Sequence, residues 1–227
     1  MMNSRKGTII SILVTVLLTI GGVYVMNNHY YERFDKSEPP ELPLSPELLE
    51  DFEGLLNGFL REVDQGVFDY KKERQVLVEM LKPDSLRFPE YVAENYDTAG
   101  QIVLSLNKRM DAVLGMFSAA DQKVKDRLLQ EPESSRDRIL ARWDNLVLTH
   151  GGFYQVYFAN EKEMLGVYLE LMEFYYEKRM EFGVDVDMDK IVFKNPDDEK
   201  MQSALRQRIA DIQKKQKNLF VKANAAP

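Results

Sequence analysis

Three aspartates at alternate positions have the spacing in this chain that comes nearest to a cation site. Asp185, Asp187 and Asp189 repeat the alternation of carboxylates with which an EF-hand calcium loop begins. The rest of such a loop is missing, because its sixth position is Lys190 instead of glycine and its twelfth is Pro196 instead of a bidentate glutamate. A calcium or magnesium site of another geometry stays open, but the segment is not an EF-hand.

The alternative interpretation of this segment is a solvated loop. Val184, Val186 and Met188 alternate with the aspartates, so these apolar side chains would touch the domain while the carboxylates face water. We adopt this interpretation, and we predict neither a metal ion nor a cofactor.

Cysteine and histidine chemistry is restricted by composition, because the chain has no cysteine and only two histidines. Disulfides, thiolate metal sites and a cysteine nucleophile are therefore excluded. His150 continues the face of Trp143 and Leu146, so we expect it to lie partly buried at the carboxyl end of a helix, where the helix dipole stabilises it. The 37 acidic residues are dispersed over polar helix faces. An enzyme would need carboxylates that converge only in space, and we predict that the protein is not an enzyme.

Aromatic side chains are concentrated in one stretch that could line a pocket for an apolar or planar ligand. The candidate pocket residues are Phe153, Tyr154, Tyr157, Phe158, Tyr168, Tyr175 and Tyr176. Filling of the core is the alternative. Buried tyrosines need partners for their hydroxyls, so this many on one helix indicates either a polar network or a partly wet cavity.

Basic side chains gather near the carboxyl end: residues 200–227 hold seven basic and one acidic side chain, in a chain of net charge -7. A basic helix there would bind anionic lipid headgroups or an acidic partner. Its candidate residues are Arg206, Arg208, Lys214, Lys215 and Lys217. The alternative is matching to the helix dipole, since Asp197, Asp198 and Glu199 begin the same helix. Nucleic acid is not an expected partner, because the chain is acidic and these basic residues lack interleaved aromatics.

The strongest signal in the sequence is an uncharged run over residues 8–26, which we predict to be a single transmembrane helix that anchors the chain in membrane lipid. Arg5 and Lys6 precede this run, whereas charges balance after it. By the positive-inside rule, residues 1–7 are cytoplasmic and the remainder is extracytoplasmic, periplasmic if the source is bacterial.

A cleaved signal peptide is the alternative for the same segment, with Gly21 and Gly22 near the cleavage site. Ile20 and Val23 flank the glycines and make a poor cleavage pattern, and apolar character continues beyond them, so we favour a retained signal-anchor.

After the anchor, residues 27–44 are rich in proline and are predicted to form an extended stalk. Residues 45–221 have helical apolar periodicity, and residues 222–227 are predicted to be a disordered tail. We therefore expect an all-α fold, an irregular bundle of about six helices broken at glycines and polar segments. The predicted helices cover 45–66, 69–82, 89–119 with a possible start at 97, 121–131, 134–150, 153–182 and 195–221.

Two functions are compatible with an anchor, a stalk and a helical domain without recognisable chemistry. The first is a non-enzymatic subunit of a cell-envelope complex that binds another protein. The second is a ligand-binding domain with an aromatic pocket, which must pass its signal to a separate protein because only about seven residues are predicted in the cytoplasm.

Overall fold

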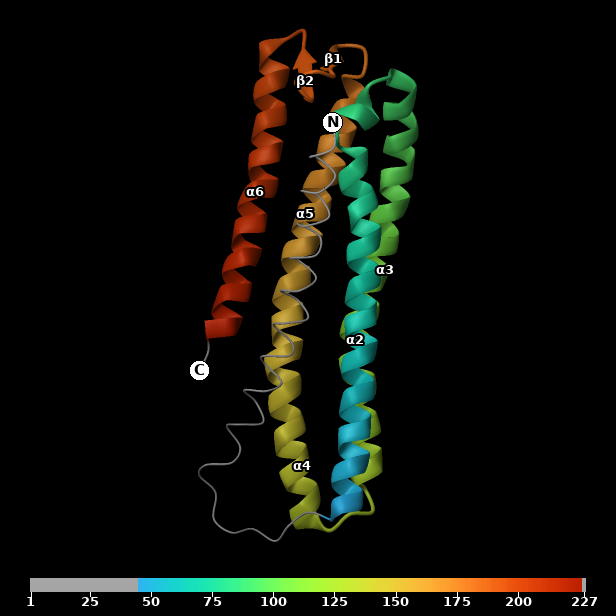
Figure 1. Ribbon diagram of the computed structural model, residues 1–227, viewed down its shortest axis with the longest axis vertical. Coiled ribbons are helices and arrows are strands. Elements are labelled where there is room, and N and C mark those ends of the chain that lie inside the picture. Colours follow the sequence, from blue (N-terminus) through green and yellow to red (C-terminus); the bar gives the residue numbers. More distant parts are fainter. Residues whose placement is uncertain (1–44, 226–227) are drawn as a thin grey trace. The chain divides into compact units, whose positions relative to one another are not determined.

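In the computed structural model, residues 45–225 are described, with side chains up to residue 221 (Figure 1). The predicted anchor at 8–26 and the predicted stalk at 27–44 lie outside the described residues. Between residues 45 and 225, no helix combines the length and apolar character that crossing a membrane requires. All contacts described below lie within residues 45–219.

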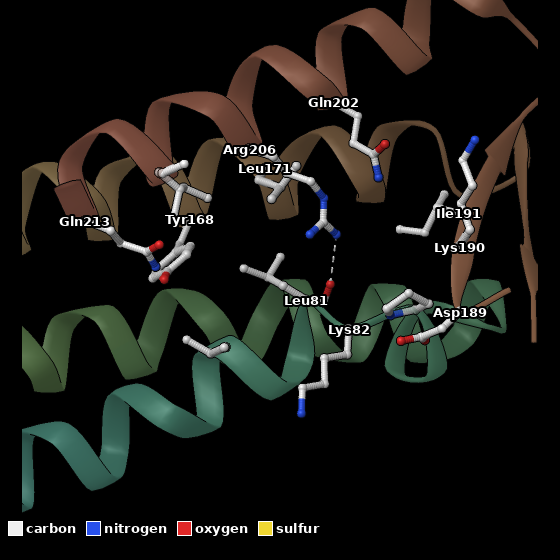
Figure 2. A pocket seen from close by; sticks show the side chains of 14 residues that line it. Leu81, Lys82, Tyr168, Leu171, Asp189, Lys190, Ile191, Gln202, Arg206 and Gln213 are labelled. Carbon is white, nitrogen blue, oxygen red and sulfur yellow. Dashed lines mark hydrogen bonds between the residues drawn. The ribbon is translucent and has the colours of Figure 1, made fainter. Parts of the chain in front are cut away.

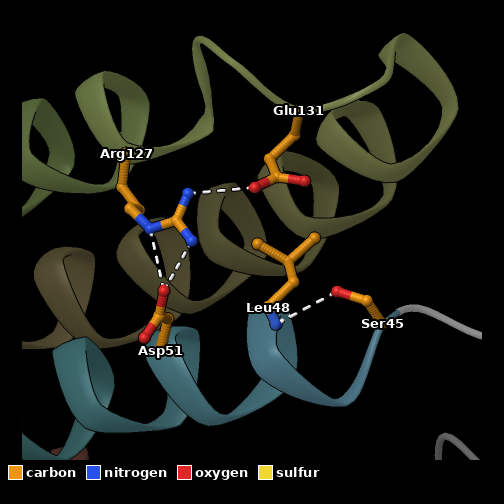
Figure 3. A network of polar contacts seen from close by, with 5 residues as sticks. All are labelled: Ser45, Leu48, Asp51, Arg127 and Glu131. Carbon is orange, nitrogen blue, oxygen red and sulfur yellow. Dashed lines mark hydrogen bonds and ion pairs between the residues drawn. The ribbon is translucent and has the colours of Figure 1, made fainter.

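The first helix, α2 (Pro46–Met80), begins as predicted, with Ser45 as its cap. The Leu48 amide donates to the Ser45 hydroxyl at 3.2 Å (Figure 3). The same end of α2 is tied to α3 (Pro89–Leu128), since Arg127 donates to the Asp51 carboxylate from Nε at 3.0 Å and also from Nη2. Arg127 Nη1 also donates to Glu131 at 2.9 Å.

The predicted end of the first helix at Gly66 is wrong, because α2 continues without a break to Met80. A Cβ at Gly66 would lie 2.7 Å from Cγ2 of Val113 on α3. The glycine therefore permits close packing between two helices and does not end one.

The predicted break near residue 120 is also wrong, since α3 runs from Pro89 to Leu128 after a short 3-10 turn, η1 (Pro83–Leu86). Its apolar stripe continues at helical spacing through the expected break. The buried members of this stripe are Val103, Leu106, Met110, Val113, Phe117, Ala120, Val124 and Leu128.

The predicted break at Gly151 and Gly152 is also absent. The helix α4 (Glu133–Leu146) passes through one π-helical turn, η2 (Val147–Gly151), directly into α5 (Gly152–Glu177). A Cβ at Gly151 would lie 3.4 Å from Cδ1 of Phe117, which is an ordinary van der Waals contact, so packing does not require glycine at this position. The described chain consequently contains four long helical segments, not about six, although the all-α expectation holds with 85% helix.

A short antiparallel hairpin interrupts the helices where a loop was expected. Strands β1 (Phe182–Asp185) and β2 (Lys190–Phe193) pair with Phe182 opposite Phe193. Asp185 Oδ1 accepts from the amides of Asp187 and Met188, both at 3.1 Å, and so closes the turn.

The side chains in this turn do not lie as expected. Val186 is 50% exposed and Met188 is 67% exposed. The expectation that they touch the domain was therefore wrong; only Val184 is half-buried. Val186 and Met188 lie in the connection between the two strands, where their side chains are exposed.

The core lies among α2, α3 and the continuous α4, η2 and α5 segment. Phe59, Phe117 and Trp143 meet there, with the Phe59 ring centroid 5.0 Å from that of Phe117 and 5.4 Å from that of Trp143. The last helix, α6 (Pro196–Ala225), extends beyond the expected end at 221 and runs beside α5 (Figure 1). It buries Leu205, Ile209 and Ile212 as its apolar stripe.

Candidate functional site

A buried carboxylate, Glu161 on α5, lies where α2, α5 and α6 come together. Its side chain has no exposed surface. Arg74 Nη1 lies 2.7 Å from Oε1 and 2.9 Å from Oε2 of this residue. Gln216 Nε2 donates to Oε1 at 2.5 Å, and the Tyr70 hydroxyl donates to Oε2. The charge is therefore paired and both oxygens accept hydrogen bonds, as a buried ion requires.

The protonation of the surrounding groups follows from burial and from this carboxylate. Burial, together with the charge of Glu161, raises the pKa of Tyr70 and the pKa of Tyr157 well above the ordinary value. Burial opposes ionisation of Arg74, but the Glu161 carboxylate, together with Tyr157 and Tyr168, raises the pKa of the guanidinium above its ordinary value. These phenols stay protonated and Arg74 stays charged, so the cluster connects α2, α5 and α6 through hydrogen bonds and one ion pair.

Two more ionisable groups lie close to this cluster on α2. Burial, followed by the charge of Arg74, lowers the pKa of Lys71. Burial raises the pKa of Asp64, and it raises that of Tyr154 to about 12. Burial is the largest cause of each of these pKa shifts, although Lys71 and Tyr154 are only half-buried and Asp64 is exposed.

Glu161 was not among the residues predicted from the sequence, although its position in the apolar pattern of the helix could have indicated it. Glu161 falls on the buried face of its helix, between Tyr157 and Phe158 on one side and Met164 and Leu165 on the other. A charged residue at a core position of a helical stripe needs a partner from another helix. The identity of that partner could not be read from the sequence, because Tyr70 and Arg74 are 91 and 87 residues away.

The seven aromatic residues predicted to line a pocket are placed on more than one face of α5. Tyr157, Phe158, Tyr168 and Tyr175 are buried, and the other three are half-buried. Several of them pack on each other or on other helices: Tyr154 stacks on Phe158 at 5.9 Å, and Tyr176 stacks on Tyr96 at 4.6 Å. The structure does not bring the seven together around one space.

A cavity of about 600 Å³ lies beside this aromatic stretch, between the end of α2, α5, the hairpin and α6 (Figure 2). Of the seven aromatic residues, Tyr168 lines it. Its apolar wall consists of Val78, Leu81, Pro83, Leu171, Ile191, Ile209 and Ala210. Its polar groups are Lys82, Asp189, Lys190, Gln202, Arg206 and Gln213, together with the Tyr168 hydroxyl.

Hydrogen bonds between helices hold the polar side of the cavity. Arg206 Nη2 donates to the Leu81 carbonyl at 3.3 Å and to the Tyr175 hydroxyl at 3.0 Å. Gln202 Nε2 donates to the same hydroxyl at 2.9 Å, and Gln213 hydrogen-bonds to Tyr168. Tyr168 and Tyr175 of α5 thus belong to a polar network that borders a cavity.

The five basic residues predicted as an interaction surface on α6 differ in their surroundings. Arg206 lines the cavity, Arg208 pairs with Glu170 on α5, and Lys215 lies 3.5 Å from Glu163. Lys214 and Lys217 are exposed. Two of the five charges are therefore turned toward acidic residues of the same chain.

The carboxylates that begin α6 pair with lysines, in addition to their favourable place at a helix amino end. Asp197 lies 2.8 Å from Lys200, and Glu199 lies 3.1 Å from Lys190. Asp198 is buried and its Oδ1 lies 3.4 Å from Lys178.

His150 is not at the carboxyl end of a helix, which corrects the expected stabilisation by the helix dipole. It lies in the π-helical turn, and the helix continues beyond it as α5. Burial lowers its pKa, so the neutral imidazole is the favoured form.

In the part of the chain that the structure describes, no three histidine or carboxylate side chains are placed to hold a metal ion. The Asp185 carboxylate accepts from the backbone of its own turn. Comparison of the chain with known proteins finds no family model, no curated protein and no solved structure that matches.

Proposed function

We propose that this chain is a non-enzymatic subunit of an extracytoplasmic complex, anchored by residues 8–26, whose helical domain binds a partner protein. The observation that carries this proposal is a group of exposed apolar side chains around the hairpin. We call this surface the hairpin end and define it by Phe88, Tyr91, Met180, Val186, Met188, Val192 and Met201.

The hairpin end concentrates apolar exposure in a small part of the chain. Among the described residues, it holds seven of the fifteen large hydrophobic side chains that are exposed. The turn η1, the start of α3, the hairpin and the start of α6 lie at the same end of the helices (Figure 1). Exposed apolar groups collected in one region favour a binding surface, whereas isolated ones are ordinary.

The types of side chain also support protein binding at this end. Three of the seven are methionines, whose unbranched and polarizable side chains adapt to irregular partner surfaces. Carboxylates and lysines border them, including Asp187 and the Glu199 and Lys190 pair. An apolar centre with a polar border is the usual composition of a protein interface.

Site-specific photo-crosslinking in the native membrane tests this proposal. A photoreactive amino acid at Met188 should give one discrete crosslinked protein, and Val186→Asp in the same chain should reduce that product severalfold. A photoreactive residue at Leu104, which is also exposed but lies in the middle of α3, is the matched control. Equal crosslinking from both positions, or none from Met188, contradicts the proposal.

A second candidate function is supported by the cavity. A volume of about 600 Å³, with one apolar wall and a few polar groups, falls within the range of small-molecule sites. In this function the domain binds a small ligand and passes the signal to a separate protein.

A further inference from the structure

We infer that the cavity between α2, α5, the hairpin and α6 binds an amphipathic monocarboxylate, with its carboxylate on Arg206 and its apolar body against the apolar lining residues. This inference rests on the second candidate function and specifies the ligand class of that site. Its basis is the difference between Arg206 and the neighbouring arginines.

Arg206 is the cavity-lining cation whose acceptors within the described residues are all neutral, and because the residue is exposed its charge is in contact with water. Its two acceptors, the Leu81 carbonyl and the Tyr175 hydroxyl, are both neutral. By contrast, Arg74 is paired with Glu161 and Arg208 is paired with Glu170. Among residues 45–221, no carboxylate lies within ion-pair distance of Arg206.

The other two cations of the cavity already have partners. Lys82 lies 2.5 Å from Glu79, and Lys190 lies 3.1 Å from Glu199. In Figure 2 the Arg206 side chain extends from α6 across the space toward Leu81, whereas the Lys82 side chain points away from Arg206. The carboxylate in the lining, Asp189, lies on the hairpin side and away from Arg206 in Figure 2, so an anion that enters the cavity would be attracted mainly to Arg206.

The Arg206 guanidinium keeps N–H groups that can donate hydrogen bonds to such an anion. A guanidinium carries five N–H donors. Both hydrogen bonds of Arg206 come from Nη2, so Nε and Nη1 retain theirs. The contacts with Leu81 and Tyr175 hold the side chain in place before a ligand arrives, which reduces the entropy lost on binding.

The apolar residues that line the cavity select the rest of the ligand. Val78, Leu81, Leu171 and Ile209 present apolar surface to the cavity. A wholly polar anion would leave this surface in contact with water, whereas an alkyl or similar apolar body would cover it. Charge and apolar surface in one cavity favour a single-headed amphiphile of the fatty-acid type.

Calorimetric titration of the full chain in lipid nanodiscs, with empty nanodiscs as reference, tests the inference. The probes are octanoate, octanol and octylammonium, which share a chain and differ in head charge. We expect octanoate to bind more tightly than octanol, and octylammonium not to bind. Arg206→Gln should weaken octanoate binding at least about tenfold while it leaves octanol binding unchanged.

Two further variants separate the ligand effect from a folding effect. Arg208→Gln removes a neighbouring positive charge that does not line the cavity, and it should leave octanoate binding unchanged. Ala210→Trp, which fills the cavity, should abolish the binding of octanoate and octanol together. Retained octanol binding in Arg206→Gln demonstrates that the cavity is still formed in that variant.

The possible failures are distinguishable. If octanoate and octanol bind equally well, and Arg206→Gln changes neither, the carboxylate assignment is overturned while the ligand-binding function stands. If Arg208→Gln weakens octanoate as much as Arg206→Gln does, the attraction is general and the assignment is likewise overturned. If none of the probes binds, the ligand-binding function fails together with the inference.

Discussion

Arg74 on α2 and Glu161 on α5 are 87 residues apart in the sequence, and their side chains lie 2.7 Å apart in the structure. Gln216 on α6 donates to the same carboxylate, so one buried charge connects three helices. Removal of one partner from a buried ion pair leaves the other uncompensated, and this makes the cluster a point where stability can be tested.

Glu161→Ala should destabilise the domain by about 3–5 kcal/mol, because it leaves the Arg74 guanidinium without its counter-ion. Glu163→Ala, two residues away, removes a carboxylate that is 52% exposed and 3.5 Å from Lys215, and it should change stability by less than about 1 kcal/mol. Denaturant unfolding followed by circular dichroism measures both. Similar losses of unfolding free energy in the two variants would mean that the buried ion pair contributes no more to stability than a surface ion pair does.

Gly66→Ala should lower stability by about 1–3 kcal/mol, because the new methyl group would lie 2.7 Å from Cγ2 of the buried Val113. Gly58→Ala is the matched control, since nothing lies within 4 Å of its Cβ position, and it should raise stability by about 0.5–1 kcal/mol. Thermal unfolding of the two variants compares them directly.

A double variant extends this test. If the close contact with Val113 is the cause, Val113→Ala should make the Gly66→Ala change much less costly, which a double-mutant cycle measures. Two independent costs that simply add would contradict the packing role of Gly66.

Stability should fall as the pH is lowered from about 7 to about 5, in part because of His150. Burial lowers the pKa of this histidine below the ordinary 6.5, so the unfolded chain takes up a proton before the folded chain does. The stabilisation is therefore complete above the unfolded pKa and is lost as the pH falls through the folded pKa. His150→Asn should flatten this part of the stability profile, and an unchanged profile would show that His150 does not contribute.

Residues 8–26 should be retained in the mature chain, and alkaline carbonate should leave the protein in the membrane fraction. Amino-terminal sequencing of protein purified from its native membrane checks the first expectation. A mature start at or after Gly22 would identify the segment as a cleaved signal peptide. The helical domain would then be secreted without an anchor.

Features that depend on neighbouring residues in the sequence could be predicted well. The start of α2 follows from Ser45 as cap and Pro46 in the first turn, and the buried stripe of α3 follows from apolar residues at helical spacing. The expectation of a polar network also came from local composition, because tyrosines such as Tyr168 and Tyr175 fall at buried positions of one helix. These features depend on interactions over one or two helical turns.

The ends of helices were less predictable, because glycine has two different uses. Gly66 and Gly151 resemble helix ends in the sequence, yet each lies inside a continuous helical segment, and at Gly66 another helix approaches closely. A break and a close contact both require a missing side chain, and only the neighbouring helix distinguishes them.

By itself, the sequence determined the all-α class, the beginning of α2 and the buried stripes, since helical propensity, capping and periodicity are local properties. Only the tertiary structure decided that Glu161 meets Arg74 and that Arg206 crosses a cavity to Leu81, which is 125 residues away. The physical reason is that hydrogen bonds and ion pairs between helices depend on how the helices pack, and this information is spread over the whole chain.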